Sequence, residues 1–516
     1  MQLGRVAMKH PSDLQTHRES DLVPEAMPDI IAPRLCDPEA VPVETPDRKP
    51  SPSEPIHEGC VKKRAQRITR RETRCAASGL CMDSDRFEES HPSLFHRRDI
   101  ARPSQVAGRR KVPLTTSLGR PDLLSVTRLL CDVRTPGDDL RYGEKKAENP
   151  NPAPVHRRPI VVWNVTRSCN LHCAHCYASS HDEVYPGELT TEQAIKVIDD
   201  LADYGIPVLL FSGGEPIKRF DLPILVKHAA DRGLRPTLSS NGTLMTPEIA
   251  RTLADAGMVR AGISLDGLEQ VNDKFRGSKG AFKDALEGIR NATDVGMRVS
   301  LRFTMTKQNV DDMPGLFDLA EEVGIPRVCI YHLAYAGRGE KLLSFDLDND
   351  RRREAVEFIF KRTIQSHATG HNLEVLTVDN HADGPILAMW AREHAPDRAD
   401  DIERLMLKNG GNSAGRGIAS IDNLGNIHPD QFWWTRNLGN VLEQPFSEVW
   451  EDADNGFLSQ LRDRKALLPQ RCRDCSWLNS CNGNLRVRGE SATGDPFGMD
   501  PACYLTDAEI AETVAV

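Results

Sequence analysis

Two tight groups of cysteines stand out in this chain, which has thirteen cysteines in 516 residues. The first group, within RSCNLHCAHCYASS, consists of Cys169, Cys173 and Cys176. Three thiolates this close together on a loop can ligate three irons of a four-iron cube and leave the fourth iron open for chemistry. A zinc ion completed by His172 or His175 would use the same residue types. The spacing alone therefore predicts a metal site and leaves both metals open.

The second group lies near the end of the sequence. Its four members follow the pattern C-x2-C-x5-C, with one more cysteine further on: Cys472, Cys475, Cys481 and Cys503. Four thiolates complete a closed iron–sulfur cluster, and a structural zinc ion takes the same ligands. Grouped thiols in a large chain without a secretion signal indicate metal binding rather than a disulfide framework.

A short glycine turn lies between the two groups. Gly213 and Gly214 end an apolar run and are followed by Glu215 and Pro216. Glycines let the backbone approach a ligand closely, and a carboxylate beside them suits a cationic amine. Alone, this pattern is more often a simple turn than a binding site.

The segments that must position these residues alternate between β-branched runs and stretches of helical period. We expect strands at 160–166, 208–214, 235–242, 260–267, 298–306 and 327–334, and helices at 191–205 and 246–257. This order predicts an α/β fold, a partial (β/α)6 barrel, with its chemistry at the carboxyl ends of the strands. The first cysteine group and the glycine turn both fall at such ends.

The remaining segments differ in composition. Residues 1–122 combine many prolines with charged residues, so we expect a disordered, low-order N-terminal extension. Residues 123–157 predict a short amphipathic helix and a Pro-rich linker. The barrel is expected at 158–385, and a smaller metal-binding domain with one helix near 446–466 at 386–516.

Charge and hydropathy limit the partners. With 66 Lys and Arg against 75 Asp and Glu, the net charge of −9 gives no basic field that would attract nucleic acid. No apolar run approaches the roughly 18 residues of a membrane-spanning helix, and no segment resembles a secretory signal. We therefore expect a cytoplasmic protein without a nucleic acid or membrane partner.

In combination, the cysteine triplet and the glycine turn resemble the radical SAM superfamily, whose members cleave S-adenosylmethionine (SAM) at a [4Fe–4S] cluster. The resemblance covers roughly residues 158–340 and includes Tyr177, Ser240–Thr243 and Ile263–Gly267. It implies that the cysteine triplet ligates the cluster and that SAM chelates the fourth iron. An electron would then split SAM into methionine and a deoxyadenosyl radical, which takes hydrogen from an unactivated carbon.

The same resemblance implies which residues contact SAM. Those expected to bind the amine are Gly213, Gly214 and Glu215. Weaker candidates for contacts with the ribose or the carboxylate are Asn241, Ser264 and Arg302. Ordinary polar residues of a barrel interior would look the same in the sequence as these last three.

The C-terminal cysteines resemble the SPASM and twitch extensions of radical SAM enzymes. This resemblance implies one auxiliary [4Fe–4S] cluster on Cys472, Cys475, Cys481 and Cys503. The pattern departs from the full seven-cysteine set, because Leu485 stands where a further cysteine would be expected. We therefore expect one auxiliary cluster rather than two.

Several short segments in the second half of the chain resemble those of a narrower branch, the radical SAM enzymes of siroheme-derived haem biosynthesis. These segments are Tyr335–Gly339, Gly410–Ser413, His428–Trp433, Cys481–Asn484 and Asp500–Tyr504. The resemblance implies a tetrapyrrole substrate and an electron donor such as ferredoxin or flavodoxin. Within the branch we favour haem d1 formation, with modification of propionate side chains of 12,18-didecarboxysiroheme. The alternatives are a 12,18-didecarboxysiroheme deacetylase, a haem b synthase, a peptide-modifying SPASM maturase and, from a different class, a non-catalytic iron–sulfur or zinc protein.

An acidic iron tetrapyrrole would be stabilised by cations near the barrel mouth and can accept an axial ligand there. The sequence offers three arginines and two histidines for these roles: Arg302, Arg338, Arg416, His332 and His428. A surface or structural role is at least as common for each of them.

Overall fold

The computed structural model describes residues 123–143 and 158–511. The extension expected at 1–122 lies outside the described residues, as does most of the Pro-rich linker expected at the end of the 123–157 segment. Among the residues that are described, no helix is long and apolar enough to cross a membrane.

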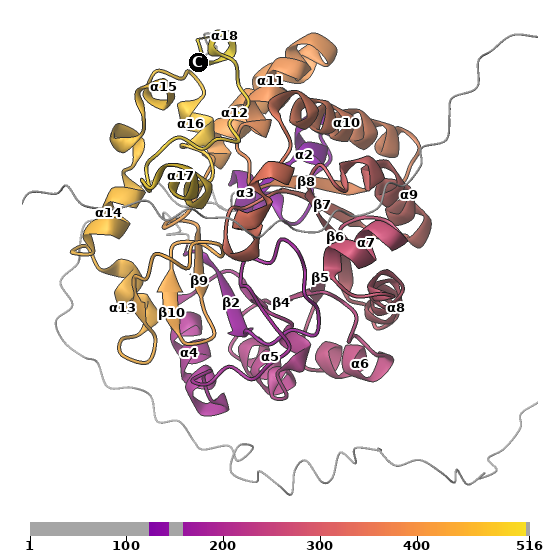
Figure 1. The fold of residues 1–516 in the computed structure, drawn as a ribbon, viewed down its shortest axis with the longest axis vertical. Coiled ribbons are helices and arrows are strands. Elements are labelled where there is room, and N and C mark those ends of the chain that lie inside the picture. The colour runs from indigo at the N-terminus through magenta and orange to yellow at the C-terminus, as the bar shows by residue number, and fades with distance from the viewer. Residues whose placement is uncertain (1–122, 144–157, 512–516) are drawn as a thin grey trace, which may run out of the picture. The chain divides into compact units, whose positions relative to one another are not determined.

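One eleven-stranded sheet runs through the described residues, with the strand order β1-β8-β7-β6-β5-β4-β3-β2-β9-β10-β11 (Figure 1). Strands β2 to β8 are all parallel and neighbour one another in chain order. Their bounds are β2 Ile160–Thr166, β3 Leu209–Gly213, β4 Pro236–Ser240, β5 Arg260–Ser264, β6 Arg298–Met305, β7 Arg327–His332 and β8 Glu374–Val378. This is the parallel α/β sheet of a partial barrel, as expected, and the six predicted strands β2 to β7 are confirmed.

The sheet continues beyond the predicted strands on both sides. On one side, β8 follows β7, and β1 (Leu123–Ser125) pairs antiparallel with β8. The short helix predicted at the start of the 123–157 segment is present as α2 (Val126–Cys131), between β1 and a second short helix, α3 (Asp138–Tyr142). The pairing of β1 with the edge of β8 was not predicted.

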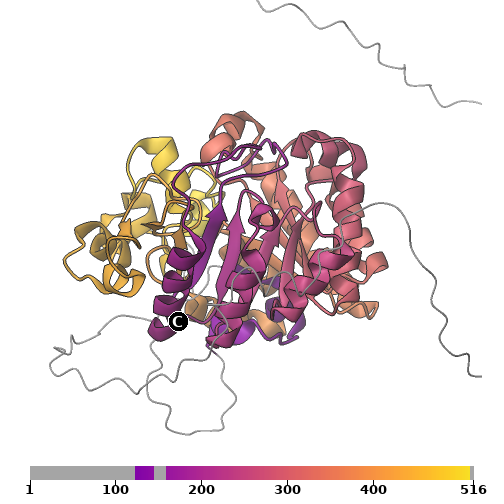
Figure 2. The same ribbon diagram turned by 90° about the horizontal axis from the view of Figure 1, so that it is seen from below.

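On the other side, β9 (Ile418–Ile421) pairs parallel with β2, and β10 (Asn426–His428) and β11 (Gly439–Asn440) follow it antiparallel. Main-chain hydrogen bonds thus join the C-terminal region to the first barrel strand. Seen from below, this region, coloured orange to yellow, lies beside β2 (Figure 2). The expected boundary at 385/386 stays a prediction.

Helices follow the strands around the outside of the barrel (Figure 1). Those of the barrel are α4 Thr191–Tyr204, α5 Leu222–Asp231, α6 Pro247–Asp255, α7 Glu269–Arg276, α8 Ala281–Asp294, α9 Met313–Val323, α10 Asn349–Ala368, α11 Asp383–His394 and α12 Ala399–Asn409. The two predicted helices are confirmed as α4 and α6. Thr190 and Thr246 cap them by accepting hydrogen bonds from main-chain N–H groups of the first turn.

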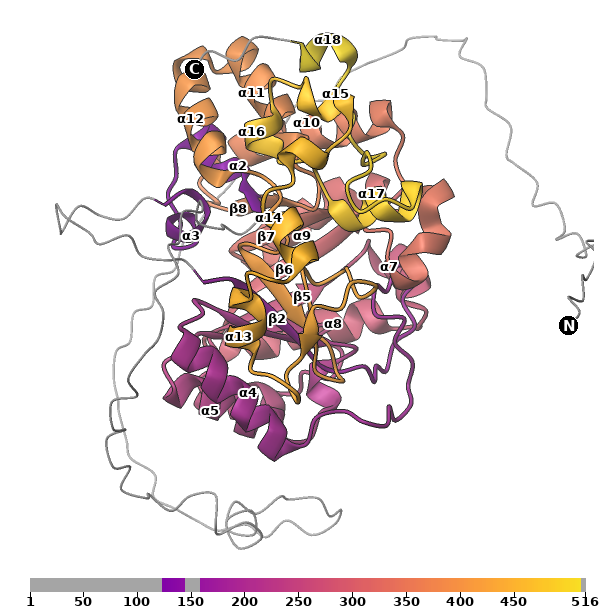
Figure 3. The same ribbon diagram turned by 90° about the vertical axis from the view of Figure 1, so that its left-hand side faces the viewer.

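Short helices make up the C-terminal region, where α16 lies beside α11 and α12 (Figure 3). They are α13 Phe446–Glu451, α14 Gly456–Arg462, α15 Gln470–Arg473, α16 Leu478–Cys481, α17 Arg486–Thr493 and α18 Asp507–Ile510. The prediction of one helix near 446–466 is wrong. The chain is extended at Asp452, and Asn455 caps a new helix by accepting from Leu458 N, so the helix is interrupted.

Alternation along the parallel strands separates two environments. Side chains such as Trp163, Phe211 and Ile263 are buried in the main hydrophobic core. The alternate side chains, such as Val162 and Leu210, line the barrel interior. Because parallel strands end at the same edge, the loops after β2 to β7 meet above this interior.

Candidate active site

The cysteine loop directly follows β2 and is held from two sides by main-chain hydrogen bonds. On one side, Ala174 N donates to Phe275 O at the end of α7, at 2.9 Å. On the other, Arg338 N donates to Cys176 O at 3.0 Å. Gly337 lies so close to the loop, with φ at 56°, that an added Cβ would be 2.6 Å from Cys176 O. The loop conformation is therefore fixed by segments that follow β5 and β7.

Each of the three sulfur atoms of this loop accepts a hydrogen bond. Leu171 N donates to Cys169 Sγ at 3.4 Å, and Ser180 N donates to Cys176 Sγ at 3.5 Å. The guanidinium of Arg276 donates to Cys173 Sγ at 3.5 Å. Donors aimed at sulfur stabilise thiolates and tune the potential of an iron–sulfur cluster. The three cysteines also pack in one small cluster, so their arrangement fits three ligands of one centre.

Burial raises the pKa of Cys169 to about 12 and also raises the pKa of Cys173. Thiols in such a site stay protonated until a cation replaces the proton. Two arginines beside the loop supply positive charge, and each keeps one buried nitrogen without a partner: Arg276 Nε and Arg338 Nη2. Orphaned donors around three buried thiols are what an anionic cluster would satisfy, so the residues present fit a [4Fe–4S] group.

The two histidines of the loop do not complete a zinc site. His172 is exposed and contacts the ring of His181, with centroids 4.8 Å apart. His175 is directed into a cavity, and burial lowers its pKa to about 4. Within 123–143 and 158–511, no three His, Cys, Asp or Glu side chains are spaced to hold a single metal ion.

The glycine turn lies directly against the cysteine loop. An added Cβ would be 2.1 Å from Thr166 O at Gly213 and 2.3 Å from Ser168 O at Gly214. The N–H groups of Gly214 and Glu215 donate to these two carbonyls, each at 2.8 Å. Since the N–H groups are engaged, the turn can offer carbonyl oxygens, which are the acceptors that a ligand ammonium needs.

Glu215 has a different local role from the one expected. It is 0% exposed, and its carboxylate accepts hydrogen bonds from Ser240 Oγ and Asn241 N, both at 2.8 Å, and from Ile217 N at 3.2 Å. Burial outweighs these bonds and raises its pKa to about 7. Glu215 thus ties the end of β3 to the end of β4, and its contact with the SAM amine stays a prediction.

Asn241 lies at the contact between the cysteine loop and the end of β4. Its amide nitrogen donates to Asn170 Oδ1 at 2.9 Å and lies 3.9 Å from Cys169 Sγ. Its amide oxygen accepts from Thr243 N at 2.9 Å. The structure therefore places Asn241 beside a predicted cluster ligand, and its contact with SAM stays a prediction.

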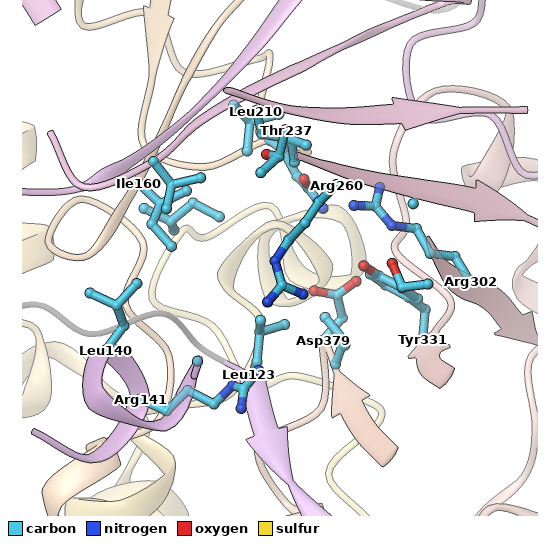
Figure 4. A pocket seen from close by; sticks show the side chains of 18 of the residues that line it. Leu123, Leu140, Arg141, Ile160, Leu210, Thr237, Arg260, Arg302, Tyr331 and Asp379 are labelled. Atoms are coloured by element: carbon cyan, nitrogen blue, oxygen red, sulfur yellow. The ribbon is translucent and has the colours of Figure 1, made fainter. Parts of the chain in front are cut away.

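A cavity of about 110 Å³ opens beside the cysteine loop at the carboxyl ends of the strands. Its lining includes Tyr177 and Ser212, Ser239, Ser264, Arg302 and Tyr331 from successive strands. Ser264 and Arg302 were predicted from the sequence, and they face this cavity together. Arg302 and Tyr331 also line a neighbouring cavity, which Figure 4 shows.

Gly262 makes room for Arg302. An added Cβ at Gly262 would lie 2.3 Å from Arg302 Nε, so the guanidinium crosses this glycine. Arg302 donates to Ser239 Oγ, while its Nε is buried without a partner. An incompletely satisfied guanidinium in a polar cavity is suited to a carboxylate or a ribose.

Sequence reasoning missed three residues of this neighbourhood: Arg276, Tyr331 and Asp379. Tyr331 could have been found from the sequence, because Arg327, Cys329 and Tyr331 are alternate residues of β7 and therefore lie on the same face of the sheet. Asp379 has φ at 67° just after β8, a strand that was not predicted. Arg276 carried no signal, because its sequence context resembles an exposed helix end.

The four C-terminal cysteines also come together. Burial raises the pKa of Cys481 well above its usual value, and the nearby thiols of Cys503, Cys472 and Cys475 raise it further. The guanidinium of Arg471 lies 3.8 Å from Cys503 Sγ. This thiol group fits a second cluster that is partly screened from solvent.

A hydrogen-bonded chain leads from this thiol group to the cavity. Tyr504, next to Cys503, donates to Asp383 Oδ1 at 2.7 Å. The other oxygen of Asp383 lies 2.9 Å from His332 Nε2, and His332 lines the cavity. All three side chains are almost fully buried. A rigid polar contact thus links the second cysteine group to the cavity wall.

The expected axial ligands are contradicted by this geometry. His332 Nε2 is engaged by Asp383, and its Nδ1 faces the amide nitrogen of Asn380 at 3.5 Å. His428 lies 3.0 Å from Arg436 O and 3.2 Å from Asp422 Oδ2 through its two nitrogens. Each histidine is 2% exposed, so neither offers a free nitrogen to iron.

Two of the expected cations also have other roles. Arg338 donates to Cys173 O and Ser180 O, each at 2.8 Å, so it holds the cysteine loop. Arg416 does not line the cavity; burial lowers its pKa, and Asp463 and Arg462 are the charges that act on it. Of the three predicted arginines, Arg302 is the one that lines the cavity.

Comparison with known proteins connects this geometry to a family. Residues 163–320 match the model described as the radical SAM superfamily. The chain is 48% identical over 394 residues to Fe-coproporphyrin III synthase of Methanosarcina barkeri, covering 75% of this chain and 99% of that relative. It is 41% identical over 366 residues to pre-heme d1 synthase of Dinoroseobacter shibae, covering 70% and 90%.

Solved structures agree on the fold. The crystal structure of Streptococcus suis SuiB bound to S-adenosylmethionine matches with a TM-score of 0.53 and 19% sequence identity. The match covers 67% of this chain and 77% of that chain. At this identity the similarity concerns the fold alone.

Proposed function

Because this chain belongs to the radical SAM superfamily, we propose that it uses SAM to remove acetate side chains from an iron tetrapyrrole derived from siroheme. The observation that carries the proposal is the 48% identity to Fe-coproporphyrin III synthase over 99% of that relative's length. Fe-coproporphyrin III keeps its propionate groups, so this name fits the acetate-removing alternative better than propionate modification.

Haem d1 formation becomes the second candidate. It is supported by the 41% identity to pre-heme d1 synthase over 90% of that relative. The order of the two candidates is thus the reverse of the expectation from the sequence. Both reactions would begin with hydrogen abstraction from a side-chain methylene, so the residues that hold SAM serve either one.

Cys169, Cys173 and Cys176 would hold a [4Fe–4S] cluster, which supplies the electron that cleaves SAM. Arg276 and Arg338 stabilise the negative charge of this region through their guanidinium groups. Carbonyl oxygens of the glycine turn accept the methionine ammonium. Ser264 and Arg302, as well as Asn241 beside the cluster, contact the rest of SAM, while the buried strand ends exclude water.

The cavity at the strand ends limits how the substrate binds. Because SAM would occupy this cavity, a macrocycle cannot also enter it. We infer that the tetrapyrrole lies across the mouth of the barrel, with one acidic arm directed toward the cavity. Phe432, which lines the cavity from the C-terminal region, is placed to contact the macrocycle.

The four C-terminal cysteines, Cys472, Cys475, Cys481 and Cys503, would hold one auxiliary [4Fe–4S] cluster. Their shared burial and the contact through Tyr504 support this role. An external donor such as ferredoxin or flavodoxin would supply the electrons.

The test is an anaerobic assay of the reconstituted full chain. Iron and sulfide are counted, then SAM and dithionite are added with and without 12,18-didecarboxysiroheme. We expect about eight irons, as for two cubane clusters, deoxyadenosine formation that the tetrapyrrole stimulates, and a tetrapyrrole product whose mass shows loss of acetate groups. Loss or oxidation of propionates with intact acetates would favour the second candidate, and no deoxyadenosine would refute both.

Two cysteine variants separate the proposed clusters. Cys176→Ala is expected to abolish deoxyadenosine formation. Cys503→Ala is expected to keep part of the SAM cleavage but to lose the tetrapyrrole product. The matched control is Cys329→Ala, because Cys329 lies in β7 and belongs to neither cysteine group. This variant should keep both activities. Product formation by Cys503→Ala at the level of the control would show that the auxiliary cluster is not needed.

A further inference from the structure

The barrel interior holds a second cavity, of about 210 Å³, which extends from the SAM cavity toward the amino ends of the strands. Arg302 and Tyr331 line both cavities. One wall of the second cavity is apolar and comes from β2 and the segment around β3, with Ile160, Val162 and Leu210. Figure 4 shows Arg260 reaching across the cavity opposite this wall.

Arginines collect at the amino end of this cavity: Arg141, Arg235, Arg260 and Arg327 line it there. Glu374 is shared, because it accepts from Arg141 at 3.1 Å and from Arg327 at 2.6 Å. Among the described residues, no carboxylate forms an ion pair with Arg260. Glu374 also acts on Arg260, but Arg141 and Arg327 bind the same carboxylate, so it does not neutralise all three guanidinium groups.

The surroundings of Arg260 make this charge unfavourable. Burial lowers its pKa to about 10, and the nearby Arg327, Arg298 and Arg235 contribute in the same direction. Arg260 still stays protonated at neutral pH. A positive charge kept under such conditions marks a place where an anion would be stabilised.

The acidic residues of the cavity wall lie toward its other end. Asp379 follows β8 and Asp430 follows β10, both beyond the carboxyl ends of these strands. Arg302 lines the cavity near these aspartates, so the two signs of charge are mixed near the site of chemistry, whereas arginines prevail at the amino end. An anion is therefore more favourable at the amino end.

We propose that the arginine end of this cavity binds a short alkyl carboxylate, with Arg260 as its counter-charge. The guanidinium matches the carboxylate, and the wall of Ile160, Val162 and Leu210 matches the alkyl group. Inorganic phosphate has no apolar group that could pack against this wall. If the chain removes acetate groups, as the proposed function holds, the two-carbon fragment released beside Arg302 is the natural occupant.

The test measures binding of labelled acetate to the full reconstituted chain, without SAM or tetrapyrrole, by equilibrium dialysis. We expect saturable binding that Arg260→Met weakens at least tenfold. Arg298→Met is the matched control, because Arg298 pairs with Arg260 across β5 and β6 but is exposed and does not line the cavity. Propionate should compete more strongly than acetate, and inorganic phosphate should not compete.

Three results would overturn the proposal: no saturable binding to the unaltered chain, equal binding by Arg260→Met, or loss of binding in Arg298→Met as well. Arg260→Lys, which keeps the charge, guards against a folding defect and should bind better than Arg260→Met; equal weakness would contradict the role of charge. Deoxyadenosine formation from SAM alone, which we expect to be unchanged, verifies that each variant is folded.

Adding 12,18-didecarboxysiroheme distinguishes the source of the carboxylate. Displacement of labelled acetate would mean that an acidic arm of the tetrapyrrole occupies the site, and binding of both together would mean that the site takes the released fragment. Each outcome requires the site to exist. Since dialysis needs no turnover, the carboxylate site can be upheld even if the tetrapyrrole keeps its acetates and the proposed function fails.

Discussion

Replacing Tyr504 by Phe tests whether the second cysteine group acts on the barrel cavity. The change removes one hydroxyl, which donates to Asp383 Oδ1 at 2.7 Å, and leaves the ring in place. Asp383 is 0% exposed. Burial raises its pKa, but the charge of His332 and hydrogen bonds that include the one from Tyr504 outweigh burial and hold this pKa below its usual value.

The magnitude follows from the loss of one donor to a buried carboxylate. Such a bond contributes about 1.5–3 kcal/mol, and the acceptor remains buried after the change. We expect Tyr504→Phe to lower the free energy of unfolding by about 2 kcal/mol. It should also release Asp383 and His332, so that the cavity wall beside the substrate shifts.

The assay compares product per SAM cleaved. Tyr504→Phe should keep most deoxyadenosine formation but give less tetrapyrrole product for each deoxyadenosine, at unchanged iron content. Tyr335→Phe is the matched control: Tyr335 is 5% exposed and donates to Asp346 Oδ2, also at 2.7 Å, in a contact that does not include His332. It should lose similar stability in urea unfolding yet keep the product ratio. Equal uncoupling in both variants, or none in Tyr504→Phe, would refute the reasoning.

Two further predictions concern the glycine turn. Gly213→Ala should abolish SAM-dependent deoxyadenosine formation and lower the midpoint of thermal unfolding, because the added Cβ would lie 2.1 Å from Thr166 O. Activity like that of the unaltered chain would contradict this close approach. Since the folded-state pKa of Glu215 is raised from 4.5 to about 7, its contribution should lower the stability of the apo chain by about 3 kcal/mol as pH rises from 4.5 to 7. Urea unfolding at several pH values should show a flatter profile for Glu215→Gln, and parallel profiles would exclude this carboxyl as the cause.

The strands of the barrel were predictable because the signal is local. A buried parallel strand is a short apolar run, and β2 to β7 are such runs between helical segments. β8 was missed although its sequence, Glu374–Val378, has the same character, because it follows a long helix and a polar turn. β9 to β11 are only four, three and two residues long, too short for a local signal, and β10 and β11 also contain Asn or Gly. They are strands because β2 offers an edge.

The candidate site was predictable in its residue types but not in its contacts. Spacing was enough to single out the cysteines, and the structure brings each group together. The role of Glu215 depends on Ser240 and Asn241, which lie 25 and 26 residues away and become neighbours only through the register of β3 and β4. Arg276 reaches Cys173 across 103 residues for the same reason, and no pattern in the sequence encodes such a contact.

The C-terminal region and the barrel are joined by a buried charge. Arg488 is 0% exposed and pairs with Asp500 at 2.7 Å. Its other nitrogens donate to Leu333 O and Asp379 O, at the ends of β7 and β8. An arginine buried this deeply is tolerated only when all of these acceptors are in place. The segment that carries Cys503 therefore cannot move without releasing the strand ends that form the cavity. The same contact that stabilises the fold holds the second thiol group at a constant position relative to the cavity.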